Sequence, residues 1–130
     1  MIKKLLIALL IISLLLETAL TFLCFFMPEK ALEQMKMVYS DVYAFPVYLI
    51  GWFLLLVTIF IAFFLIAAIK NNQQYNKAVY ILCFWWIGIG IGIYCFNGLT
   101  TNLLTDTLKG ILLLILTYLN SKNQLKASSL

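Results

Sequence analysis

The chain has 130 residues, of which 65% are hydrophobic and 11% charged, and its nine lysines and five acids give a formal net charge of +4. A soluble domain of this size cannot hide so large an apolar fraction from water, so the composition predicts a membrane protein. Six of the nine lysines flank apolar segments instead of alternating with aromatic residues, which argues against a nucleic-acid partner. Histidine is absent, which excludes His-ligated zinc or haem and Ser-His-Asp chemistry. We therefore expect no metal and no cofactor.

Four apolar segments dominate the chain, and each has about the 17 to 25 residues that a membrane-spanning helix needs. They cover residues 4–26, 45–69, 78–96 and 103–119. Backbone polar groups in lipid need internal partners, and the segments lack the alternation of barrel strands, so helices are expected. The predicted fold is all-α: one membrane domain over residues 1–130, built as an integral four-helix bundle, with a solvated tail over residues 120–130.

The lysines predict how these helices are oriented. Three pairs fall on the same side of the four segments, and no acid stands beside them. The pairs are Lys3 and Lys4, Lys70 and Lys77, and Lys122 and Lys126. By the positive-inside rule this side faces the cytoplasm, so both termini are expected to be cytoplasmic.

The segment after the first span, residues 28–40, is predicted to form a short amphipathic helix on the outer leaflet. Pro28 suits the first turn of a helix. Apolar residues recur at helical spacing opposite the charged ones, as in interfacial helices. These apolar residues are Ala31, Leu32, Met35, Val38 and Tyr39. An irregular loop remains the alternative.

An acid and a base stand at matching depth inside the apolar segments. Glu17 is 13 residues beyond Lys4, and Lys109 is 13 residues before Lys122 on a segment of opposite direction. At a rise of about 1.5 Å per residue, both lie roughly 20 Å above the cytoplasmic interface. Because an ionised glutamate is costly in hydrocarbon, we predict that Glu17 pairs with Lys109.

Other polar residues extend this site toward the outer face. Asp106 is one helical turn from Lys109 and could share it, and Tyr94, Asn97 and Asn102 would complete a polar pocket that opens outward. Several interpretations stay open. The ion pair could only set helix register, or the pocket could bind a ligand or an ion. Glu17 could also face a partner's helix or be protonated.

The glycines of WWIGIGIGIY predict a packing face and not a phosphate loop, because no strand precedes them and the GxGxxG and GKS spacings are absent. Gly88, Gly90 and Gly92 are small enough to let a second helix approach closely. The crossing could lie within the bundle or between subunits.

Three cysteines contain no CxxC motif, which argues against a thioredoxin-like site. Cys83 is expected to be a buried apolar residue. Cys24 and Cys95 stand at similar heights near the outer face, where a disulfide could form between them.

The chain resembles, in its architecture, the DoxX-like group of small bacterial membrane proteins. The stretches GIGIGIYCFNG and LLTDTLKGILLL look like the third and fourth helices of related bacterial families. The number of spans, the cytoplasmic termini and the Phe45-Pro46 entry to the second span agree with that architecture. The resemblance implies a location in the bacterial inner membrane and an accessory role. It transfers no catalytic motif to this chain.

The function expected from these features is that of a small accessory or scaffolding subunit, which acts through lateral helix contacts and is not an enzyme. Its partners would be membrane lipid and either a larger membrane protein or further copies of the chain. The alternative is a binder or carrier of a small amphipathic molecule or ion, held in the outward-facing polar pocket.

Overall fold

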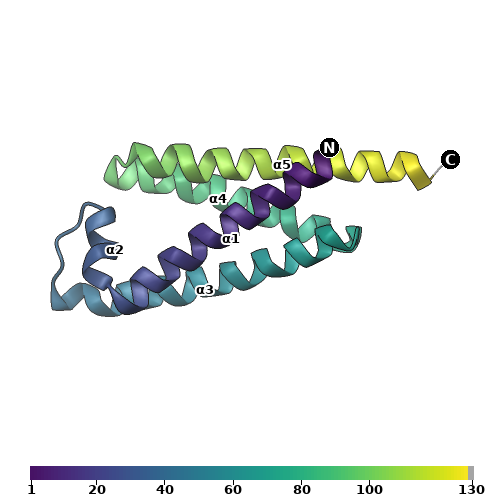
Figure 1. Ribbon diagram of the computed structural model, residues 1–130. Coiled ribbons are helices and arrows are strands. Elements are labelled where there is room, and N and C mark those ends of the chain that lie inside the picture. Colours follow the sequence, from purple (N-terminus) through teal and green to yellow (C-terminus); the bar gives the residue numbers. More distant parts are fainter. Residues whose placement is uncertain (129–130) are drawn as a thin grey trace. The chain divides into compact units, whose positions relative to one another are not determined.

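The computed structural model describes residues 1–128, except for the side chains at positions 73, 96, 97, 102 and 126–128. Its elements are α1 (Ile2–Phe26), α2 (Pro28–Gln34), α3 (Asp41–Ile69), the 3-10 turn η1 (Gln73–Tyr75), α4 (Asn76–Asn97) and α5 (Thr100–Ser128). The described backbone is all-helical, which confirms the predicted class (Figure 1). As predicted, four helices, α1, α3, α4 and α5, are long and apolar enough to cross a membrane, which is typical of a multi-pass membrane protein.

Helix α2 is shorter than the predicted helix over residues 28–40. Lys36 has a φ of 56°, which a right-handed helix cannot continue. The backbone N–H groups of Lys36 and Met37 donate back to the carbonyls of Glu33 and Leu32, at 2.9 and 3.0 Å. This pattern is a Schellman cap, and it reverses the chain without a glycine. Val38, predicted to lie on the apolar face, is 86% exposed.

The same cap ends α3 and positions the polar turn that follows. Asn71 has a φ of 56°, and asparagine tolerates this conformation better than most residues. Its N–H donates to the Ala68 carbonyl at 3.3 Å, and the N–H of Asn72 donates to the Ala67 carbonyl at 2.9 Å. The turn is therefore a fixed structure that presents asparagine side chains.

Helix α5 is longer than predicted, because residues 120–128, expected to form a tail, continue it. This stretch contains no glycine or proline that would stop a helix. It is also held by the turn after α3. Asn76 Nδ2 donates to Ser121 Oγ at 2.6 Å, and Gln124 Nε2 donates to Asn71 Oδ1 at 3.2 Å. The two polar segments thus bind one another instead of being only solvated.

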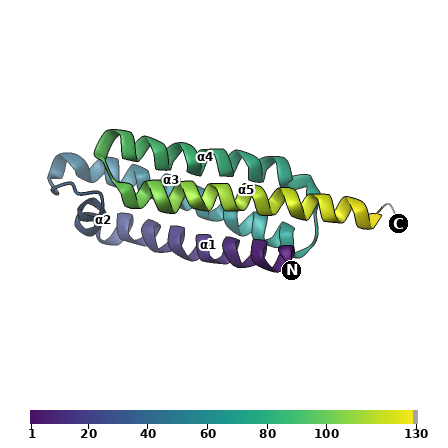
Figure 2. The same cartoon turned by 90° about the horizontal axis from the view of Figure 1, so that it is seen from above.

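The chain forms two compact units. Unit 1 consists of Met1–Ile11 and Phe64–Leu130, and unit 2 of Ile12–Phe63. In unit 1, α4 and α5 run antiparallel and side by side, as Figures 1 and 2 both show. Their connection turns at Gly98, which has a φ of 65° and donates its N–H to the Tyr94 carbonyl at 2.8 Å. The tight turn makes α4 and α5 close neighbours over their length.

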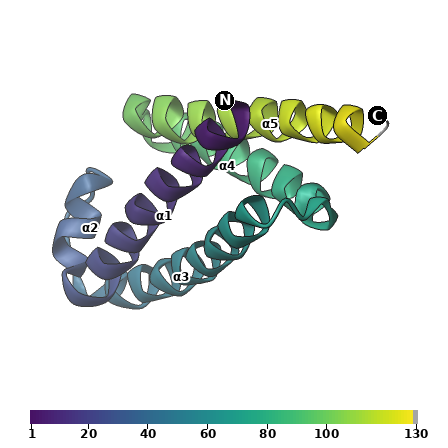
Figure 3. The same ribbon diagram turned by 45° about the vertical axis from the view of Figure 1, so that its right-hand side comes forward.

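In unit 2, α2 packs beside the end of α1 and the start of α3 (Figure 3). The buried residues of this contact are Cys24, Ala31, Leu32 and Val47. Gly51 of α3 allows the close approach, because a Cβ placed there would lie 3.0 Å from Cys24 Cβ. The ring of Phe25 meets Trp52 edge-on, with centroids 5.5 Å apart.

Candidate functional site

An ion pair that is largely shielded from solvent lies on α5 in unit 1. Lys109 Nζ lies 3.2 Å from Asp106 Oδ1, and the two side chains are only 10% and 18% exposed. Their spacing of three residues puts them on one face of the helix. The structure thus brings together two of the residues that the sequence singles out.

The same ammonium group contacts an aromatic ring of the neighbouring helix. Lys109 Nζ lies over the ring of Trp86 on α4, 4.1 Å from its centroid, and Trp86 is 3% exposed. The negative face of a desolvated indole attracts a cation by about 2 kcal/mol. We call Trp86, Asp106 and Lys109 the Lys109 cluster.

Gly110 explains why this contact forms. A Cβ placed at Gly110 would lie 2.8 Å from the backbone oxygen of Cys83 and 2.8 Å from Ile87 Cγ1. The backbones of α4 and α5 therefore meet at this point, as small residues allow in membrane helices. Because Lys109 directly precedes the meeting point, its side chain can reach a ring on α4.

The chemistry of the Lys109 cluster is that of a compensated charge. The ammonium group has a carboxylate on its own helix and a ring face on the next, both in surroundings of low dielectric constant. We expect such an arrangement to favour one rotation of α5 against α4. Among the described side chains, no group of three His, Cys, Asp or Glu could hold a metal ion.

Glu17 belongs to unit 2 and is 3% exposed. Ser13, Thr21 and Cys24 share its face of α1 and are also buried. Thr21 Oγ1 donates to the backbone oxygen of Glu17 at 2.7 Å. These side chains, three or four residues apart, therefore form one buried face of α1. The pairing of Glu17 with Lys109 stays a prediction.

Two other residues of the predicted outer pocket lie near the end of α4. Tyr94 is 43% exposed. Asn97 is the last residue of α4, and its side chain, like that of Asn102 on α5, is outside the described part of the chain. The outward-facing pocket stays a prediction.

The close helix contacts among the described residues are made by glycines other than Gly88 and Gly92, two of the three that were predicted to pack. Among the residues that the structure describes, a Cβ placed at Gly88 or Gly92 would meet no atom within 4 Å. Gly90 is buried. Gly110 and Gly51 make the close contacts instead. For Gly110, the sequence offered one indication of this crossing: a glycine inside an apolar helix, directly after Lys109.

Trp86 is the member of the Lys109 cluster that no pattern in the sequence indicates. Trp85 and Trp86 are adjacent in an apolar helix, yet Trp85 is exposed and Trp86 buried. Residues next to each other on a helix point in different directions, and only the position of α5 decides which of them meets the lysine.

The three cysteines are free thiols: Cys24 and Cys83 are buried and Cys95 is exposed. The structure therefore gives no support to a bond between Cys24 and Cys95, which stays a prediction. We expect N-ethylmaleimide to label one thiol of the detergent-solubilised protein, Cys95, and all three after denaturation, as read by mass spectrometry. A Cys95→Ser variant should take up no label before denaturation. Labelling of two thiols only after reduction would instead indicate the disulfide.

Comparisons with protein-family models, with curated proteins and with solved structures found no match for this chain.

Proposed function

We propose that this protein is a small subunit of the bacterial inner membrane that acts as an accessory or scaffold through lateral contacts of its helices, without enzymatic activity of its own. The main support is the exposed face of α4 that carries Gly88 and Gly92, which we call the outer face of α4. Gly88 and Gly92 stand four residues apart on it, with open space at both positions. Small residues at this spacing let a second helix approach closely and contact the backbone.

The surroundings of these glycines fit a helix contact. Large apolar side chains of α4 flank them and are exposed: Ile81, Phe84, Trp85 and Ile91. Three hydroxyl groups elsewhere on the spans are used inside their own helices. Thr18, Thr58 and Thr105 each donate to the carbonyl four residues earlier. The exposed surface of α4 is therefore better suited to packing against another helix than to binding a polar ligand.

The proposed orientation places both termini in the cytoplasm. Lys3 Nζ donates to the Ile69 carbonyl at 3.0 Å, which joins the start of α1 to the end of α3. The bond between Asn76 and Ser121 joins the start of α4 to the last part of α5. All three lysine-bearing segments therefore lie at one end of unit 1, in agreement with the positive-inside rule.

Native mass spectrometry of the protein, extracted from its own membrane in mild detergent, tests the proposal. We expect a complex with a second polypeptide or with further copies of the chain, and the added mass tells which. The double variant Gly88→Leu, Gly92→Leu should lose the partner. The control Leu104→Phe, which adds bulk at an exposed position of α5, should retain it. A wild-type protein that is extracted alone, or a glycine variant that keeps the partner, would overturn the proposal.

A further inference from the structure

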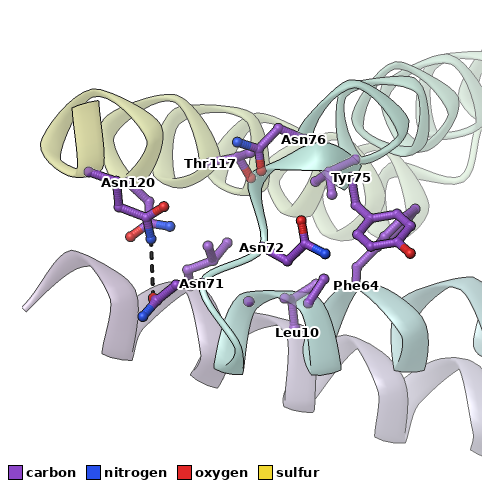
Figure 4. Close-up of a pocket in the computed structure, with 13 residues that line it drawn as sticks. Leu10, Phe64, Asn71, Asn72, Tyr75, Asn76, Thr117 and Asn120 are labelled. Atoms are coloured by element: carbon purple, nitrogen blue, oxygen red, sulfur yellow. Dashed lines mark hydrogen bonds between the residues drawn. The ribbon is translucent and has the colours of Figure 1, made fainter. Parts of the chain in front are cut away.

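A small pocket lies at the lysine-bearing end of unit 1, where the turn after α3 meets the start of α1 and the last part of α5 (Figure 4). The space inside it that a water molecule can occupy is about 20 Å³. A cavity needs roughly 10–15 Å³ of such space to hold one water molecule, so the pocket accepts a guest of that size and nothing much larger. It shares no residue with the Lys109 cluster or with the outer face of α4.

Thr117 of α5 lines the pocket with a hydroxyl group that has no partner. The residue is 2% exposed, and its Oγ1 makes no hydrogen bond within the part of the chain that the structure describes. Thr21 and Thr58, in contrast, donate to the carbonyl four residues earlier, as threonines in helices often do. Buried hydroxyl groups are normally hydrogen-bonded, and ordered water serves as a partner as well as protein atoms do. The Thr117 hydroxyl is thus available to a guest in the pocket.

Two carboxamides of the lining can bind the same guest. Asn76 Nδ2 donates to Ser121 Oγ at 2.6 Å, and Ser121 Oγ donates in turn to the Thr117 carbonyl at 2.9 Å, which holds Asn76 close to Thr117. Asn72 Oδ1 accepts from the backbone N–H of Gln74 at 3.0 Å. A carboxamide has one acceptor oxygen and two donor hydrogens, so Asn76 keeps its acceptor and Asn72 its donors. Together with the threonine hydroxyl they provide about the three partners that a buried water molecule uses.

The rest of the lining disfavours an ion of similar size. Leu10 and Phe64 are buried and form an apolar wall. The described lining contains no carboxylate, and the exposed Lys70 and Lys77 flank its turn, so a metal cation would meet no opposite charge. An anion would give up its hydration without a charged partner in the lining, which is costly. A neutral molecule of the size of water remains.

We propose that this pocket is a hydration site, in which one ordered water molecule joins the Thr117 hydroxyl to the carboxamides of Asn72 and Asn76. The water satisfies the buried hydroxyl and connects α5 to the turn after α3 and to the start of α4. The direct bonds from Asn76 to Ser121 and from Gln124 to Asn71 join the same segments. A bridging water is nearly as favourable in enthalpy as a direct hydrogen bond, so it forms part of this polar contact.

The effect of Thr117→Val on thermal unfolding of the full chain in detergent distinguishes a hydrated hydroxyl from an unsatisfied one. The variant replaces the hydroxyl with a methyl group of similar size, so the bridge to the water is lost without a cavity. We expect the unfolding temperature to fall by about 4 °C, as the loss of one hydrogen bond gives in a domain of this size. If the hydroxyl had no partner, valine would be neutral or stabilising, and that result would overturn the proposal. Thr105→Val is the matched control, because Thr105 is an exposed threonine of the same helix that bonds its own backbone, and it should leave the unfolding temperature unchanged.

Hydroxyl-radical labelling with a short X-ray pulse detects the water directly, because a radical formed from a bound water oxidises the side chains beside it. Leu10 and Leu113 are both fully buried, at 1% and 0% exposed, but only Leu10 lines the pocket. We expect mass spectrometry to find Leu10 oxidised more strongly than Leu113 in the wild type, and the difference to become smaller in Thr117→Val. Equal oxidation of the two leucines in the wild type would overturn the proposal. A higher unfolding temperature in sodium chloride than in sodium gluconate of the same concentration would also overturn it, since the guest would then be an ion.

Discussion

Replacing Lys109 with methionine is expected to lower the free energy of unfolding by roughly 3 kcal/mol, because it breaks a largely shielded ion pair and a cation–π contact. The methionine fills a similar volume, so the loss reports the ammonium group and not a cavity. That group contacts both Asp106 at 3.2 Å and the ring of Trp86 at 4.1 Å. Unfolding in mixed detergent and dodecyl sulfate micelles, followed by tryptophan fluorescence, measures the change.

Lys77→Met is the matched control, because Lys77 is exposed and should be replaced without a measurable change. Asp106→Asn should cost less than Lys109→Met, since an amide oxygen can still accept from the ammonium group. Equal stability of Lys109→Met and Lys77→Met would show that the Lys109 cluster contributes nothing.

The predicted contact between Glu17 and Lys109 can be tested by a double-mutant cycle. Glu17→Gln and Lys109→Met are made singly and together, and a coupling of about 1 kcal/mol or more is expected if the side chains meet. Additive losses would show that Glu17, on the buried face of α1, does not interact with Lys109. The buried polar face of α1 and the Lys109 cluster would then stabilise their units independently of one another.

Gly110→Ala is expected to lower the free energy of unfolding by about 1–3 kcal/mol, as overpacking of a filled contact does. The new Cβ would stand 2.8 Å from the backbone oxygen of Cys83, which cannot move aside like a flexible side chain. Gly88→Ala adds the same methyl group to another helix glycine but meets no atom within 4 Å. It should leave stability unchanged or raise it by about 0.5–1 kcal/mol, because alanine has the higher helix propensity.

The pair of variants separates packing from propensity, since both make the same chemical change inside an apolar helix. Unfolding in the same mixed micelles gives the two free energies side by side. If Gly110→Ala is as stable as Gly88→Ala, then α4 and α5 do not meet at Gly110. Co-purification of Gly88→Ala with its partner should also be weaker, because the glycine face is then no longer open.

The helices themselves follow from local information. Runs of apolar residues of spanning length leave the backbone no other structure in lipid, so their number and type can be predicted from residues 4–26, 45–69, 78–96 and 103–119. The polar stripe of α1 follows from the helical repeat, because Ser13, Glu17 and Thr21 recur every fourth residue. The helix ends were harder to predict. Lys36 ends α2 in a left-handed backbone conformation, where a glycine would normally be the sign of a helix end.

The candidate site, too, could be predicted from the sequence only in part. The sequence by itself determined that Asp106 and Lys109 share a face of α5, because three residues make nearly one turn. Only the tertiary structure decided that Trp86 and not Trp85 meets the lysine, and that Gly110 makes the close crossing while Gly88 and Gly92 remain open. The physical reason is that helical periodicity sets directions around one axis, whereas a contact between two helices depends on the rotation and height of both.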